Sequence, residues 1–260
     1  MKGILCVAAL LLCSTPLLSQ AGPEAQLSFD VAAIKPSVPG DRSGRFITMQ
    51  GAHQFVARNH TLKTLLMAAY NVPAPGIVGG PPWLDMDRYD IAASTPGESR
   101  PTLDMQMAML RTLLADRFQL AFHREQREAA VYELTVARGG PTLKETATPA
   151  GVQPVLVNRL SPGRVQLPAR NATMSQFASM LQRSVLDRHV LDKTGLTARY
   201  DFDLEWTPDE TQFGGQLPPV PATENPKPDL FAAMQQQLGL RLQSSRGMVD
   251  VIVIDRVERP

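Results

Sequence analysis

The sequence has 260 residues, of which 43% are hydrophobic and 20% are charged, and its formal net charge is +1. This hydrophobic fraction is enough for a packed core and argues against extensive disorder. The near-neutral charge gives no electrostatic basis for binding nucleic acid or an anionic membrane surface.

The first 21 residues are typical of a secretory signal peptide. Lys2 makes the start of the chain positive, residues 4–12 are apolar, and Ser19 and Ala21 supply the small side chains that a signal peptidase recognises. The apolar run is too short to span a membrane, and no later run approaches the roughly 20 residues that a spanning helix needs. We therefore expect a protein that is exported to the bacterial periplasm or exterior after cleavage near Ala21 and is not membrane-spanning.

Both cysteines, Cys6 and Cys13, lie within this segment. The large Leu12 occupies the position before Cys13 where a lipoprotein signal needs a small residue, which argues against lipidation. The mature chain is therefore expected to have no disulfide, no thiolate metal site and no cysteine nucleophile. Such a chain fits an exported bacterial protein better than a eukaryotic one.

Two short motifs recur along the rest of the chain. Residues 57–62 read Ala-Arg-Asn-His-Thr-Leu, and residues 169–174 read Ala-Arg-Asn-Ala-Thr-Met. Residues 88–91 read Arg-Tyr-Asp-Ile, and residues 199–202 read Arg-Tyr-Asp-Phe. A helix pattern that runs into a hairpin pattern is a third landmark in each half. The same order at a nearly constant offset predicts an internal duplication with two like-folded units.

The first unit is expected to cover residues 22–140. Apolar residues spaced three and four apart predict its helices, and alternating apolar and polar residues predict its strands. In chain order, the expected elements are strands 29–34 and 46–49, a helix from Leu62, a strand 89–93, a helix 102–117, and a β-hairpin of 118–122 with 132–136 around a polar turn.

Residues 141–153 are rich in Gly, Pro and Thr and are expected to link this unit to a second one at 154–260. Residues 207–229 hold six prolines and are expected to be an extended, mobile insertion. The fold class is therefore α+β, with two tandem copies of a strand-helix-strand-helix-hairpin unit and mixed or antiparallel sheets. In chain order, the elements expected in the second unit are strands 155–157 and 164–167, a helix from Met174, a strand 200–206, a helix 230–238, and a β-hairpin of 240–242 with 249–254.

Asn59 and Thr61, and again Asn171 and Thr173, stand just before an apolar helical stripe. Their side chains are expected to cap helices by accepting the free N–H groups of the first turn. Gln176, three residues after Thr173, completes a capping-box pattern. This role fits better than N-glycosylation, which the Asn-x-Thr pattern would signal only in a eukaryotic secretory pathway.

The sequence contains no motif for catalysis, phosphate binding or cofactor binding. The four histidines lack the spacing of a metal site, and there is no HExxH, no Gly-x-Ser-x-Gly elbow and no glycine-rich phosphate loop. We therefore expect no catalytic residue, no metal ligand and no cofactor. Asp201, Asp203 and Glu205 share one strand face, which suits a bound cation or, more simply, a solvated sheet surface.

Residues 79–85 read Gly-Gly-Pro-Pro-Trp-Leu-Asp and form the most distinctive segment. The Gly and Pro residues interrupt helix and strand, so the chain must turn and present Trp83. A Trp on a turn either plugs the core or anchors a partner. If it anchors a partner, then Trp83, Asp85 and Arg88 are the candidate ligand- or partner-binding residues.

A resemblance to a known family rests on segments 29–37, 79–85, 88–90, 114–118, 123–125, 190–201 and 253–260. Together they resemble a large paralogous family of exported proteins of unknown function that is typical of Acidobacteria such as Solibacter. The family offers no established catalytic residues. In some relatives a similar module follows a BlaR-type sensor metallopeptidase, which implies sensing or binding outside the membrane. This chain lacks the HExxH and the membrane helices of such a peptidase.

Residues 190–202, which follow an Asn-x-Thr-capped helix, are also similar to the short N-terminal domains of secretins and TonB-dependent receptors. Those domains are small α+β modules that bind other proteins, so the likeness is an analogy at the level of the fold. The expected function is a non-catalytic binding or protein-interaction module of the envelope, whose partner is an unknown protein or an envelope polymer. One alternative is a polymer hydrolase, which needs two carboxyl groups roughly 5 to 10 Å apart in a cleft. Another is a structural envelope protein.

Overall fold

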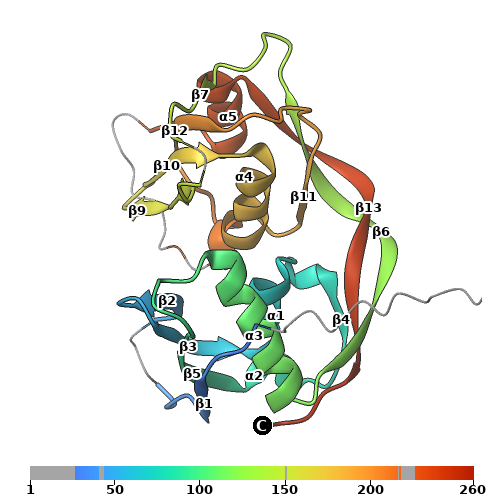
Figure 1. Ribbon diagram of the computed structural model, residues 1–260. Coiled ribbons are helices and arrows are strands. Elements are labelled where there is room, and N and C mark those ends of the chain that lie inside the picture. The colour runs from blue at the N-terminus through green and yellow to red at the C-terminus, as the bar shows by residue number, and fades with distance from the viewer. Residues whose placement is uncertain (1–26, 41–43, 150, 216, 218–225) are drawn as a thin grey trace, which may run out of the picture.

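The computed structural model describes residues 27–40, 44–149, 151–215, 217 and 226–260. The predicted signal peptide and residues 216 and 218–225 of the predicted insertion lie outside this described part. Its helices and strands form two lobes, which a long two-stranded ribbon joins along one side (Figure 1). The fold is α+β, as the sequence predicts.

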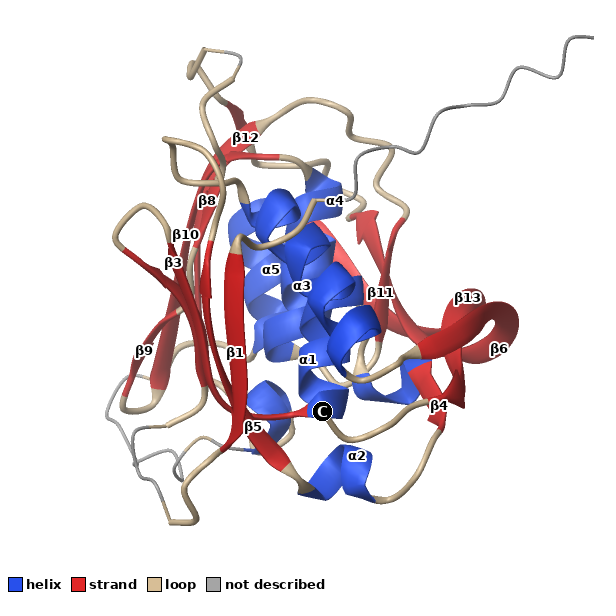
Figure 2. Ribbon diagram, turned by 60° about the horizontal axis from the view of Figure 1, so that its bottom comes forward, coloured by secondary structure: helices blue, strands red, loops and turns tan. Residues whose placement is uncertain are grey.

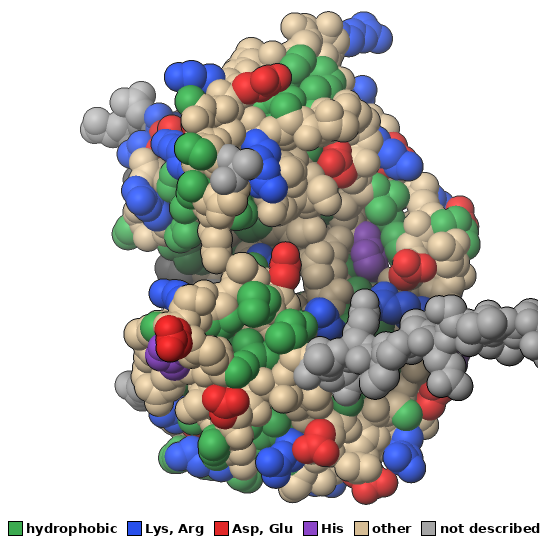
Figure 3. Space-filling model, viewed as in Figure 1, with side chains coloured by type: hydrophobic (Ala, Val, Ile, Leu, Met, Phe, Trp, Pro, Cys, Tyr) green, Lys and Arg blue, Asp and Glu red, His purple; other side chains and the backbone are tan. Residues whose placement is uncertain are grey.

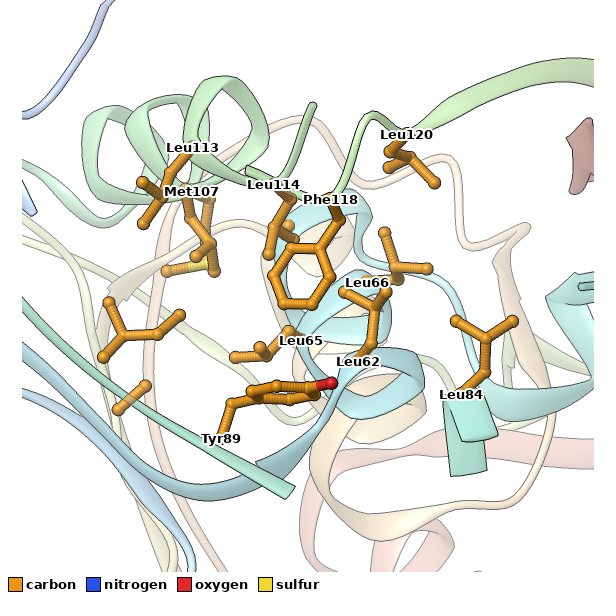
Figure 4. Close-up of a cluster of buried hydrophobic side chains, with 14 of the residues drawn as sticks. Leu62, Leu65, Leu66, Leu84, Tyr89, Met107, Leu113, Leu114, Phe118 and Leu120 are labelled. Atoms are coloured by element: carbon orange, nitrogen blue, oxygen red, sulfur yellow. The ribbon is translucent and has the colours of Figure 1, made fainter. Parts of the chain in front are cut away.

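The first lobe contains β1 (Val31–Pro36), β2 (Phe46–Gln50), β3 (Gln54–Thr61), α1 (Leu62–Tyr70), the 3-10 turn η1 (Ala74–Gly76), β4 (Ile77–Gly79), α2 (Trp83–Met86), β5 (Arg88–Ser94) and α3 (Leu103–Arg117). Four of the strands form an antiparallel sheet in the order β1-β5-β3-β2. Helix α1 buries the predicted stripe that begins at Leu62, and these side chains meet Tyr89 from β5 and Leu114 from α3 (Figure 4). The first hydrophobic core therefore lies between this sheet and its helices.

The second lobe contains β7 (Lys144–Glu145), β8 (Val155–Leu156), β9 (Arg159–Ser161), β10 (Arg164–Ala172), α4 (Met174–Met180), the π-helical turn η2 (Leu181–Val185), β11 (His189–Asp192), β12 (Tyr200–Trp206), the 3-10 turn η3 (Gln212–Gly215) and α5 (Leu230–Leu238). Its sheet has the order β7-β12-β10-β8, and β9 also pairs with β10. Strand β12 alternates as predicted, because Phe202, Leu204 and Trp206 are buried while Asp203 between them is exposed.

The two predicted hairpins are wrong, because each is one long strand. Strand β6 (Ala121–Val136) and strand β13 (Leu240–Arg256) pair antiparallel along their whole lengths. The residues expected to turn find partners on the other long strand: Arg124 pairs with Ile252, and Arg246 pairs with Ala130. The polar residues that were expected to form turns instead lie on the exposed faces of this two-stranded ribbon. The chain does not reverse direction there.

Each long strand begins in its own lobe and ends in the other one. Leu134 of β6 is fully buried in the core of the second lobe, and Ile252 of β13 is fully buried in the core of the first. Strand β11 of the second lobe pairs parallel with β6, and β4 of the first lobe pairs parallel with β13. The lobes therefore exchange strands, and neither closes its apolar face with its own half of the chain.

The helices lie between two walls of strands (Figure 2). Helix α5 packs on β12 of one wall and on β13 of the other, and α1 likewise packs on β3 and β4. The sheets of the two lobes form one wall, and the four-stranded sheet β11-β6-β13-β4 forms the other. Helices with a sheet on both sides have little exposed surface, which explains why the predicted stripes are so completely buried.

The recurring motifs form the same hydrogen-bonded arrangement in each lobe. Asn59 has φ 57°, its N–H donates to Asp90 Oδ1 at 3.0 Å, and its carbonyl accepts from Arg88 at 2.9 Å. Asparagine tolerates this left-handed conformation better than most residues. Both arrangements lie at bulges, where β3 and β10 shift register against β5 and β12. The second lobe repeats both bonds, at 2.8 and 2.9 Å, with Asn171, Asp201 and Arg199.

Two further segments differ from expectation. The predicted linker contains β7, which pairs with β12 at the edge of the second sheet. The beginning of the predicted mobile insertion is folded, since Gln212 is 1% exposed and accepts a hydrogen bond from Trp206 Nε1 at 2.8 Å. Phe213 stacks on the same indole ring with centroids 6.4 Å apart. Backbone pairing places the first segment, and contacts with Trp206 place the second.

The threonines of the repeated motif cap their helices, whereas the asparagines do not. The Thr61 hydroxyl accepts from the Thr64 N–H at 3.3 Å, and the Thr173 hydroxyl accepts from the Gln176 N–H at 3.2 Å. The Gln176 side chain in turn accepts from the Thr173 N–H at 3.0 Å, which completes the predicted capping box.

Replacing Thr173 by Ala is expected to lower the free energy of unfolding by about 1 kcal/mol, because α4 loses the acceptor for a first-turn N–H group. Urea unfolding followed by circular dichroism measures this change. Thr173→Ser keeps the hydroxyl and serves as the control, with a smaller loss. Equal unfolding midpoints for Thr173→Ala and the wild type would refute the capping role.

Candidate functional site

A cleft of about 510 Å³ lies between the two lobes. The end of α1 and the start of α3 form one wall, and α4 with η2 forms the other. The surface is visibly hollowed between the lobes (Figure 3). A volume of this size is within the usual range for small-molecule sites. Its lining includes the polar or charged residues Tyr70, Asn71, Asp104, Arg111, Ser179 and Arg183.

Asn71 connects the two walls. It ends α1 with a left-handed backbone, φ 53°, and its Nδ2 donates to Ser179 Oγ at 3.0 Å. Gln182 of η2 donates to the Asn71 carbonyl, and its own Oε1 accepts from the Val190 N–H at 3.1 Å. The contact between the lobes at the cleft is therefore made by hydrogen bonds, which can be exchanged for bonds to water.

Tyr70 and Arg111 are held against each other on the first wall. Arg111 donates to the Ala69 carbonyl at 2.7 Å, and its guanidinium lies 5.8 Å from the centre of the Tyr70 ring. Burial raises the pKa of Tyr70, and the charges of Arg111 and Arg124 oppose this rise only in part. The tyrosine therefore remains a neutral hydroxyl at physiological pH.

Arg183 is a partly buried charge on the second wall of the cleft. It lies within η2, and burial lowers the pKa of its guanidinium, while the charge of Asp104 from the other lobe acts in the opposite direction. Among the described residues, no carboxylate lies within 4.0 Å of the guanidinium. The side chain is partly buried without an ion pair, which favours the binding of an external anion.

The structure does not gather the three predicted site residues into one pocket. Trp83 is 9% exposed within the first core, beneath the guanidinium of Arg259 at 5.1 Å, which favours its interpretation as a core plug. Asp85 is exposed and pairs with Lys63 at 3.0 Å. Arg88 lines an open groove beside β5, to which neither Trp83 nor Asp85 contributes. Their role in binding a partner remains a prediction.

The acidic face of β12 is neutralised by its neighbours. Asp203 pairs with Arg170 at 2.9 Å, and Glu205 pairs with Lys227 at 2.9 Å. Asp201 accepts a hydrogen bond from the backbone N–H of Asn171 in the repeated motif. The described part of the chain holds no group of three His, Cys, Asp or Glu residues that could bind a metal ion.

A family model described as a protein of unknown function, DUF3738, matches residues 63–257. The chain belongs to the DUF3738 family. This match runs from α1 almost to the end of the chain, so the cleft and the ribbon both lie within the DUF3738 region. Neither a curated protein nor a solved structure matches the chain. No helix in the described part is long and apolar enough to cross a membrane.

The residues of the DUF3738 cleft were not identified from the sequence. They come from segments that are far apart in the chain and carry no shared motif. Asn71 alone has a local signal, because Asn often occupies the left-handed position after a helix. Arg183 has no local signal in the sequence, because what distinguishes it is its partial burial and the charge of Asp104 on the opposite wall.

Glu205 on β12 has a strongly lowered pKa in the folded protein. Burial raises the pKa of Glu205, but hydrogen bonds from Lys227, Gln166 and Arg164 outweigh burial and lower the pKa to about 2. Because the folded state binds the proton more weakly than the unfolded state, the ionised carboxylate stabilises the fold above the ordinary pKa of 4.5. This contribution disappears as the pH falls toward about 2.

Glu205→Gln is therefore expected to be less stable than the wild type at neutral pH, and the difference should shrink between about pH 4.5 and pH 2. Urea unfolding across this pH range measures it. Asp203→Asn is the matched control on the same strand, with a small effect, because its side chain is 71% exposed. A difference that stays constant with pH would contradict the assignment.

Proposed function

We propose that the protein is an exported binding module of the bacterial envelope that holds a small ligand between its two lobes. The observation that carries this proposal is the cleft, whose walls come from two lobes with separate hydrophobic cores. A site between two bodies can open to admit a ligand and close to bury it. The predicted signal peptide and the resemblance to exported acidobacterial proteins support the location.

The connection between the lobes suits such a motion. Two strands, β6 and β13, cross from lobe to lobe, and small residues occupy the middle of the crossing, where Ala129 pairs with Gly247. A small third cluster, formed by the buried Val131, Val249 and Val251 of the ribbon itself, lies near this crossing. A polar contact at the cleft and a connection by two strands are typical of lobes that can rotate as rigid bodies.

The cleft favours binding over the alternative of hydrolysis. Hydrolysis by paired carboxyl groups needs two acids flanking the substrate. Asp104 is the one acidic residue among those that line the cleft in the described chain. Of the partners expected from the sequence, an intact protein or polymer is too large for about 510 Å³, so a fragment or small molecule fits better.

The test measures the distance between the lobes. Ser94 on β5 and Ser161 on β9 are exposed, and the described residues include no cysteine, so Ser94→Cys with Ser161→Cys gives one pair of spin labels across the cleft. The low-molecular-mass filtrate of a periplasmic extract is expected to shorten the distance measured by pulsed electron paramagnetic resonance.

The control pair lies within the first lobe, with Ser94→Cys and Asp116→Cys at the exposed end of α3. Its distance should not change with the filtrate. An unchanged distance across the cleft, with the filtrate at high concentration, would argue against ligand-driven closure.

A further inference from the structure

We propose that the ligand of the cleft is a short peptide, or a molecule of the same chemistry, with a free carboxylate, a free amino group and an apolar side chain. This inference rests on the proposed function and names the class of ligand that the same cleft takes. It assigns the carboxylate to Arg183, the amino group to Asp104, and the apolar side chain to the leucines and methionines of the walls.

Arg183 is the group that binds the carboxylate. A guanidinium offers parallel N–H donors that match the two oxygens of a carboxylate. Because no described acid pairs with Arg183, these donors remain available on the cleft wall. Arg183 also lies in the π-helical turn η2, and such turns are frequent at functional sites.

Asp104 provides the opposite charge on the other wall. It stands in the first turn of α3, is exposed, and is close enough for its charge to affect Arg183 without forming an ion pair. A cation and an anion that face one cleft from two lobes suit a ligand with both charges. Such a ligand would be bound by both lobes at once and would therefore favour the closed arrangement.

Apolar side chains also line the cleft beside these two charges. Leu103, next to Asp104, is 48% exposed, and Leu156 and Met180 lie on the opposite wall. An exposed leucine in a cleft is stabilised when an apolar group of the ligand covers it. The position of these side chains beside the two charges matches a peptide with a side chain such as leucine.

Two other ligand classes fit less well. A saccharide needs an open aromatic face, but the guanidinium groups of Arg111 and Arg124 lie over the Tyr70 ring, and Phe122 meets the ring edge-on at 5.0 Å. Tyr70 is the only aromatic residue of the described cleft lining. A phosphate carries up to two negative charges, and Asp104 in the same cleft would repel the second.

Isothermal titration with the dipeptide Leu-Leu, its C-terminal amide and its N-acetyl derivative tests the assignment. The wild type is expected to bind Leu-Leu about 10- to 100-fold more tightly than the amide, because a hydrogen-bonded charge is lost. Arg183→Gln should weaken Leu-Leu to the affinity of the amide and leave the amide unchanged. Asp104→Asn should remove the difference between Leu-Leu and its N-acetyl derivative.

Arg159→Gln is the matched control, because Arg159 is exposed on β9 and does not line the cleft. Melting curves check that each variant is folded, and Arg183→Lys, which keeps the charge but loses the paired donors, should bind Leu-Leu with intermediate affinity. Leu-Leu affinity that is the same for Arg183→Gln and for the wild type would overturn the assignment.

The spin-label pair separates this inference from the proposed function. A distance that shortens with the extract filtrate, in a protein that does not bind Leu-Leu, overturns the peptide class and leaves ligand binding in place. A distance that changes with neither probe overturns both. Shortening with Leu-Leu that Arg183→Gln abolishes supports both.

Discussion

The pairing of β6 with β13 is the constraint on which the rest of the structure depends. These two strands run side by side from Leu240 opposite Val136 to Arg256 opposite Ala121. Their ends complete the cores of both lobes, and their outer edges receive β4 and β11. The ribbon therefore fixes the side on which the lobes are joined, and with it the side on which a cleft can form.

Polar side chains in this protein mostly serve the backbone. The left-handed Asn59 and Asn171 are each held by an aspartate and an arginine, so the bulges in β3 and β10 leave these backbone groups satisfied. The acids of β12 are similarly paired with basic residues. Against this background Arg183 differs, because its charge is partly buried and its partner is missing among the described side chains. The contrast locates the site more clearly than any single motif.

Much of the local structure could be predicted from the sequence. Helix 230–238 and strand 200–206 have the predicted bounds, because one has a left-handed glycine and a capping aspartate at its ends and the other strictly alternates. The sequence could not show that the two expected hairpins are long strands, because a polar strand segment that pairs with a distant strand has the same local pattern as a turn. Strand β4 was missed because three residues are too few to show alternation.

The site was less predictable than the fold. Trp83 attracted attention through its unusual neighbours, yet it is buried, and the cleft is made of common residues whose value comes from being placed together. Asn71 and Arg183 line one cleft although they belong to different lobes, and no local pattern encodes this proximity. The recurring Arg-Tyr-Asp motif, in contrast, is a structural feature that the sequence made conspicuous.

The exchange of strands also determines when the protein can fold. The core of the first lobe needs Ile252 and Ile254 of β13, which are synthesised after the other strands and helices of both lobes. Until then the apolar side of α1 lacks part of its cover, although its own sheet has long been synthesised. The first lobe can therefore complete its core only after the second lobe has been synthesised, although most of the first lobe precedes it in the sequence.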